Sequence, residues 1–126
     1  DVLRLFGDEP LTPLAEYRRL LVRVHGRIRM LFANAKIIFA LTTPVIEEMA
    51  IPEFSRKNSE IDEYNRAAIE TLTPLGVTIH DLNRCAGEIQ QQYYRDWVHF
   101  NPEGSALLAD QVTAAIRGVL DTGAEG

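Results

Sequence analysis

An aspartate and a histidine three residues apart, Asp96 and His99, stand near the C-terminus of the chain. A histidine acts as a general base when a carboxylate binds one ring nitrogen, because this fixes the tautomer and leaves the other nitrogen free to accept a proton. The spacing lets one loop supply both groups, although such a pair is by itself common. The two residues could form the acid–base part of a nucleophilic active site. By themselves they favour the alternative, a loop histidine that binds Asp96 for packing alone.

Another histidine–aspartate pair, His80 and Asp81, is a rival location for chemistry. Adjacent residues of a strand point to opposite faces of a sheet, so these two side chains are poorly placed to cooperate. We interpret Asp81 as a helix cap and His80 as structural. A metal site built from this pair with Asp96 and His99 is a further alternative. No local ligand spacing supports it, and we expect neither a metal nor another cofactor.

The serines of the chain are less suited to nucleophilic chemistry. They are Ser55, Ser59 and Ser105. All three lie near the starts of predicted helices, and none stands on a strand-to-helix turn of the nucleophile type. We interpret them as capping or surface residues. Arg56 and Asn58 could reach the binding crevice, but a surface charge and a helix cap explain them without that assumption.

The elements that must position these residues follow from the spacing of apolar side chains. Recurrence every three or four positions predicts helices, and short runs rich in β-branched and aromatic residues predict strands covered on both faces. Asn101 followed by Pro102 marks the start of the last helix. The predicted order begins with a helix from an N-cap at Thr12 to about Phe32, a strand over Lys36–Leu41 and a helix over Arg56–Leu72. A strand over Val77–His80 and a helix through Arg84–Gln91 follow. The last helix buries Leu108, Val112, Ala115, Ile116 and Val119, and residues 120–126 form a frayed tail.

Strands that alternate with helices make a parallel sheet with helices on its faces, so the predicted fold class is α/β. In such sheets the binding crevice lies beyond the carboxyl ends of the strands, here at Thr42, Thr43 and Pro44 and at His80 and Asp81. Two strands are too few, because a buried parallel pair leaves hazardous open edges. We therefore expect residues 1–126 to be the C-terminal portion of a single domain. Its N-terminal half would come from the same gene or from a companion chain.

Composition restricts the partners. Apolar residues make up 46% and charged residues 25% of the chain, as in ordinary globular domains. A net charge of -5 without a long basic run argues against nucleic acid. The longest apolar run, Ile37–Leu41, is far shorter than the roughly 20 residues that span a bilayer, so we expect a soluble chain without a membrane span. Residues 1–6 do not resemble a signal peptide, and the compartment stays open.

The order of these features is similar to the C-terminal half of the SGNH, or GDSL-type, hydrolases. The resemblance covers residues 1 to about 120. Its most specific part is the stretch 96–104, which resembles the family's fifth block, where the aspartate and histidine of the catalytic triad share one loop. Asp1 looks like a residue at or just after the block that carries the oxyanion asparagine. The further matches, in order, are Tyr17, Thr42-Thr43-Pro44, Arg56 with Asn58, Tyr64-Asn65 and Asp81-Leu82.

This resemblance implies a three-layer α/β/α fold of flavodoxin-like topology and an ester hydrolase that works through an acyl-enzyme, without a cofactor. It implies that His99 takes the proton of a serine and that Asp96 orients His99. The blocks with the serine and the oxyanion glycine and asparagine do not occur in this sequence, so the N-terminal half would supply them. The implied substrate is a small-molecule, carbohydrate or lipid ester. Two alternatives stay open: a non-catalytic domain of this fold that binds a ligand or partner protein, and a free-standing doubly wound binding or signalling domain.

Overall fold

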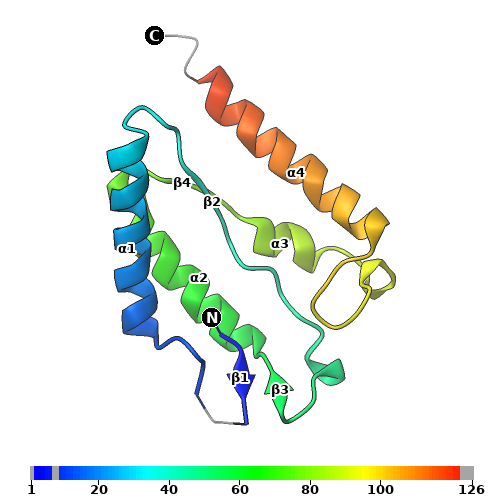
Figure 1. The fold of residues 1–126 in the computed structure, drawn as a ribbon. Helices are drawn as coiled ribbons and strands as arrows, with labels where there is room; N and C mark the ends of the chain where they lie inside the picture. Colours follow the sequence, from blue (N-terminus) through cyan, green and yellow to red (C-terminus); the bar gives the residue numbers. More distant parts are fainter. Residues whose placement is uncertain (1, 7–8, 123–126) are drawn as a thin grey trace.

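The computed structural model describes residues 2–6 and 9–122 of the chain. Its strands and helices are, in order, β1 (Arg4–Leu5), α1 (Leu14–Leu31), β2 (Ile38–Ala40), β3 (Phe54–Ser55), α2 (Asn58–Leu72), β4 (Thr78–His80), α3 (Leu82–Gly87) and α4 (Pro102–Asp121). Three short 3₁₀ turns, at Glu47–Met49, Thr73–Leu75 and Gln91–Tyr93, connect them. The chain is therefore a mixed α/β protein (Figure 1). None of the described helices is both long and apolar enough to cross a membrane.

Two small sheets, each of two strands, form within the described residues. β2 and β4 run parallel with Phe39 opposite Ile79, and β1 pairs antiparallel with β3. The parallel pair across a helical connection confirms the βαβ pattern expected from the sequence. β4 contacts both α2 and α4. Figure 1 shows the β2–β4 pair running between α1 and α2 on one side and α3 and α4 on the other.

The burial of these strands differs from the expectation. The sequence predicts two strands covered on both faces, but no residue of β2 or β4 is buried, and Ala40 and Thr78 are exposed. The flanking Leu41 and Val77 are buried. Two strands shield little of each other's surface, and among the described residues no other strand lies beside this pair. The side-chain types predicted the strands correctly, whereas burial depends on neighbours that the pattern does not reveal.

The core lies between α1, α2 and the loop that follows β2. Val2, Val45, Ile61 and Tyr64 form its buried cluster. Ile61 is fully buried. The rings of Tyr64 and Tyr17 pack with their centroids 5.1 Å apart. This cluster joins α2 to the segment that leaves the carboxyl end of β2.

Two of the predicted helix starts are confirmed. The Asp81 carboxylate accepts the backbone N–H of Arg84 at 3.0 Å at the start of α3. The Asn101 side chain accepts the N–H of Gly104 at 2.9 Å at the start of α4. Both caps are local to the sequence, and a short polar side chain in the right place suffices.

Other helix boundaries differ from the prediction. α1 begins after Pro13 without a side-chain cap, and Thr12 instead accepts the hydroxyl of Tyr64 through its carbonyl oxygen. α2 begins at Asn58 rather than Arg56, and α3 ends at Gly87 rather than near residue 91. α4 continues to Asp121, so residues 120 and 121 are helical and not frayed. Residues 123–126 of the predicted tail lie outside the described residues.

The apolar face of α4 is only partly covered, contrary to the expectation. Of its five predicted core residues, Ile116 is 46% exposed. The remaining four are half-buried: Leu108, Val112, Ala115 and Val119. Exposed apolar side chains also follow one another at the end of α1, at Met30, Leu31 and Phe32. The physical reason is that α4 packs mainly on α3, β4 and the turn at 91–93, which cover one side of it.

Candidate active site

Asp96 and His99 lie on the loop between the 3₁₀ turn at 91–93 and α4. The Asp96 Oδ2 atom stands 2.8 Å from the Nδ1 atom of the His99 ring. The side chain of His99 is 64% exposed and that of Asp96 is 40% exposed, so the far side of the imidazole is open to a reacting group. The spacing in the sequence therefore becomes a direct carboxylate–imidazole contact.

The Asp96 carboxylate is held by backbone groups as well as by the ring. Its Oδ1 atom accepts the N–H groups of Val98 at 2.8 Å and His99 at 2.6 Å. These two bonds and the bond to the His99 ring hold the pKa of Asp96 well below its usual range, because each favours the ionised form. The turn thus fixes both the charge and the position of the carboxylate. A purely structural turn would use the same backbone bonds, so the ring contact is the feature that points to chemistry.

The geometry also sets the tautomer of His99. An ionised carboxylate only accepts hydrogen bonds, so the Nδ1 atom facing Asp96 carries the proton in the neutral ring. The Nε2 atom is then unprotonated and able to accept a proton from a nucleophile. This is the arrangement that general-base catalysis by histidine requires.

The loop is tied to the start of α4. The Asn101 N–H donates to the carbonyl oxygen of Tyr93 at 2.9 Å, and the rings of Tyr94 and Phe100 pack at a centroid distance of 4.4 Å. Gly104 lies against this turn so closely that an added Cβ atom would stand 2.5 Å from the Tyr93 carbonyl oxygen. The close backbone approach explains a glycine in the first turn of a helix, where alanine is otherwise favoured.

The same loop also contacts the segment that follows β2. The Tyr94 hydroxyl donates to the Pro44 carbonyl oxygen at 3.3 Å, and the Ile46 N–H donates to the Trp97 carbonyl oxygen at 2.9 Å. The loop with Asp96 and His99 therefore lies at the carboxyl end of β2, the edge at which parallel sheets bind ligands.

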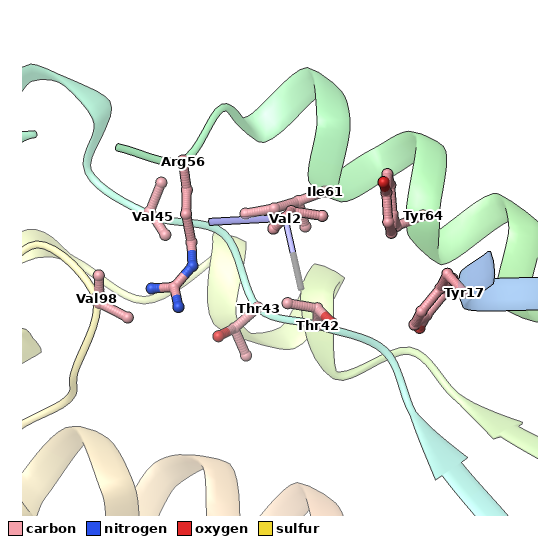
Figure 2. A pocket seen from close by; sticks show the side chains of 9 residues that line it. All are labelled: Val2, Tyr17, Thr42, Thr43, Val45, Arg56, Ile61, Tyr64 and Val98. Carbon is pink, nitrogen blue, oxygen red and sulfur yellow. The ribbon is translucent and has the colours of Figure 1, made fainter. Parts of the chain in front are cut away.

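A cavity of about 230 Å³ opens at this edge. Figure 2 shows the Arg56 side chain reaching toward Thr43 and Val98, the residue that directly precedes His99. Arg56 is half-buried and lies 5.9 Å from the centroid of the Trp97 ring, so its interpretation as a surface charge is wrong. Burial lowers the pKa of its guanidinium from the usual value. The complete lining comprises Val2, Tyr17, Thr42, Thr43, Val45, Arg56, Ile61, Tyr64 and Val98.

The other candidates from the sequence are not brought to this pair. Asp81 caps α3, and the Nε2 atom of His80 is buried without a hydrogen-bond partner in the described structure. No hydrogen bond joins His99 to a serine among the described residues: Ser55 lies in β3, Ser59 in α2 and Ser105 in α4. Within the same part of the chain, no group of three or more His, Cys, Asp or Glu residues is placed to hold a metal ion.

Two asparagines of α2 contribute to the site in a way that the sequence analysis missed. Asn58 is interpreted from the sequence as a helix cap, but its amide binds the backbone of Val45. Asn65 binds the backbone of Thr42 and is 4% exposed. Their separation of seven residues, which places both on one face of a helix, is a signal in the sequence that could have indicated a shared target.

Comparisons with known proteins identify the fold but no family. No family model matches the sequence, and no curated protein matches it. A solved structure described as "a putative platelet activating factor from Streptococcus pneumonia" matches with a TM-score of 0.72 and 21% sequence identity. The match covers 82% of this chain and 51% of that chain, so this chain spans about half the length of the solved structure. At this level of identity the likeness shows a common α/β fold and nothing of the activity.

Proposed function

We propose that this chain is the C-terminal half of an ester hydrolase of the SGNH, or GDSL, type. The observation that carries the proposal is the 2.8 Å contact between the Asp96 carboxylate and the His99 ring, on an exposed loop at the carboxyl end of a parallel strand pair. The carboxylate is ionised and oriented, and the other ring nitrogen is available as a base. This is the His–Asp part of a serine triad.

In the proposed reaction, His99 Nε2 accepts the hydroxyl proton of a serine from the N-terminal half as the serine oxygen attacks the ester carbonyl. The resulting imidazolium is stabilised by Asp96 and gives its proton to the departing alcohol, which leaves an acyl-enzyme. Water then attacks the acyl group with His99 again acting as base, and the serine is released. The donors for the oxyanion also belong to the N-terminal half. No step needs a cofactor, and the acyl group and alcohol of the ester, from a small molecule, a carbohydrate or a lipid, stay open.

The fold supports a division into two halves. The β2–β4 pair has no further strand beside it among the described residues, and apolar side chains at the end of α1 and along α4 are exposed. A three-layer flavodoxin-like domain would pair the free edge of β2 with strands of the N-terminal half and cover these side chains. The match to about half of a longer solved structure is consistent with this division.

The test is hydrolysis of p-nitrophenyl acetate by the full-length protein and its variants. His99→Ala should lower kcat by about 10³-fold or more, because it removes the base of the first step. His80→Gln is the matched control and should change kcat by no more than a few-fold, since the buried Nε2 atom of His80 forms no hydrogen bond with the pair. An active His99→Ala enzyme would contradict the assignment. A folded full-length protein without activity on any ester would favour the non-catalytic binding domain instead.

A further inference from the structure

The segment that follows β2 is held by two side-chain amides of α2. The Thr42 N–H donates to Asn65 Oδ1 at 2.9 Å, and Asn65 Nδ2 donates to the Thr42 carbonyl oxygen at 2.9 Å. Three residues further on, the Val45 N–H donates to Asn58 Oδ1 and Asn58 Nδ2 donates to the Val45 carbonyl oxygen, again at 2.9 Å each. Each asparagine thus binds both polar groups of one backbone residue, as a neighbouring strand would.

The spacing of the two asparagines matches the spacing of their targets. Seven residues along α2 correspond to a rise of about 10.5 Å. Three residues of extended chain, from Thr42 to Val45, span about 10 Å. The helix therefore holds the segment at both ends without bending it. Asn65 is buried and Asn58 is half-buried, so water does not easily replace these bonds.

Residues 42–46 in turn support the loop with Asp96 and His99. Pro44, between the two fixed residues, accepts the hydroxyl of Tyr94, and Ile46, directly after Val45, donates its N–H to the Trp97 carbonyl oxygen. These two bonds lie on either side of Asp96, and Trp97 is two residues before His99. A shift of residues 42–46 would therefore carry the loop with it.

We propose that Asn58 and Asn65 are positioning residues of the site, which fix residues 42–45 against α2 and through them set the location of the Asp96–His99 loop. In the described structure neither asparagine lines the cavity or forms a hydrogen bond with His99. The effect on rate rests on the proposed function, whereas the effect on the loop does not. A misplacement of about 1 Å at a reacting group can cost about 100-fold in rate.

The kinetic test uses Asn58→Ala in the full-length protein with p-nitrophenyl acetate as substrate. We expect kcat to fall 10- to 100-fold with KM within about threefold, because the loop is displaced rather than the binding surface removed. Asn34→Ala is the matched control, since Asn34 is exposed beyond the opposite end of β2, and it should leave kcat unchanged. A folded Asn58→Ala protein with the wild-type kcat would overturn the proposal.

A second readout is independent of any hydrolase activity. Amide hydrogen exchange of the full-length Asn58→Ala protein should be faster at Val45, whose N–H loses its acceptor. Exchange should also be faster at Ile46, whose N–H donates to Trp97, and at Val98, whose N–H donates to Asp96 within the loop. Faster exchange at Val45 alone would show a merely local role and overturn the proposal even if kcat falls. If Asn58→Ala does not fold, Asn58→Asp, which keeps the acceptor for Val45 and removes the donor, provides the same comparison. Absence of ester hydrolysis in the wild type would defeat the proposed function and leave the exchange result decisive for the positioning role.

Discussion

Gly104 offers the sharpest test of how the loop with Asp96 and His99 packs on α4. In a Gly104→Ala variant the new Cβ would stand 2.5 Å from the Tyr93 carbonyl oxygen, 3.0 Å from Tyr93 Cβ and 3.3 Å from Phe100 Cβ. The nearest of these is a backbone atom, so the turn must move by about 0.5 Å or more to reach an acceptable contact. Strain of this kind costs about 1–3 kcal/mol. Replacing a helical glycine by alanine offsets up to about 1 kcal/mol of that cost.

Gly118 is the matched control because it lies in the same helix with nothing within 4 Å of an added Cβ. Gly118→Ala should therefore show the propensity gain without the strain. The free energy of unfolding of the full-length protein, measured in urea, should be about 1–3 kcal/mol lower for Gly104→Ala than for Gly118→Ala. Equal stability of the two variants, or a more stable Gly104→Ala protein, would refute the close seating of the loop on α4.

Three further predictions concern the pair and the fold. Asp96→Asn should leave the full-length protein folded and lower kcat by about 10²–10⁴-fold, because the orientation and stabilisation of His99 are lost; a variant with wild-type kcat would exclude an orienting role. The N–H groups of His99 and Val98 and the His99 ring lower the pKa of Asp96 in the folded chain. The ionised Asp96 carboxylate therefore contributes fully to the free energy of unfolding above the ordinary pKa of about 3.9, and this contribution is lost as the pH falls below that value. Urea unfolding at pH 5 and pH 3 should show a smaller loss for Asp96→Asn than for the wild type, and equal losses would contradict the bonds described for Asp96. Residues 1–126 expressed alone should be poorly soluble or loosely packed, since among the described residues no strand pairs with the other edge of β2 and apolar side chains of α1 and α4 are exposed. Cooperative unfolding of residues 1–126 in calorimetry would contradict the division into two halves.

The features that the sequence predicted correctly are those decided by neighbouring residues. Asp81 and Asn101 cap helices because a carboxylate or amide oxygen reaches an N–H three residues ahead. Asp96 reaches His99, three residues ahead, for the same reason. Gly104 likewise has a local cost at a helix start, and its close approach to Tyr93 explains that cost.

Contacts between distant segments were not predictable in the same way. Asn58 could cap a helix or bind another segment, and only the approach of Val45 decides between them. Thr12 resembles an N-cap, yet the hydroxyl of Tyr64 takes its carbonyl oxygen and the helix begins later. The burial of β2 and of the apolar face of α4 depends on which elements lie beside them, and residue types alone do not contain that information.

The most direct test of the proposed function is the reaction of the full-length protein with a serine-directed fluorophosphonate, followed by mass spectrometry to locate the adduct. The account predicts one adduct, on a serine outside residues 1–126, formed by the wild type and lost or strongly slowed in His99→Ala. An adduct on Ser55, Ser59 or Ser105 would show that the nucleophile belongs to this chain and that the division into two halves is wrong. No adduct on a folded wild-type protein, or equal labelling of wild type and His99→Ala, would contradict the role of His99 as the general base.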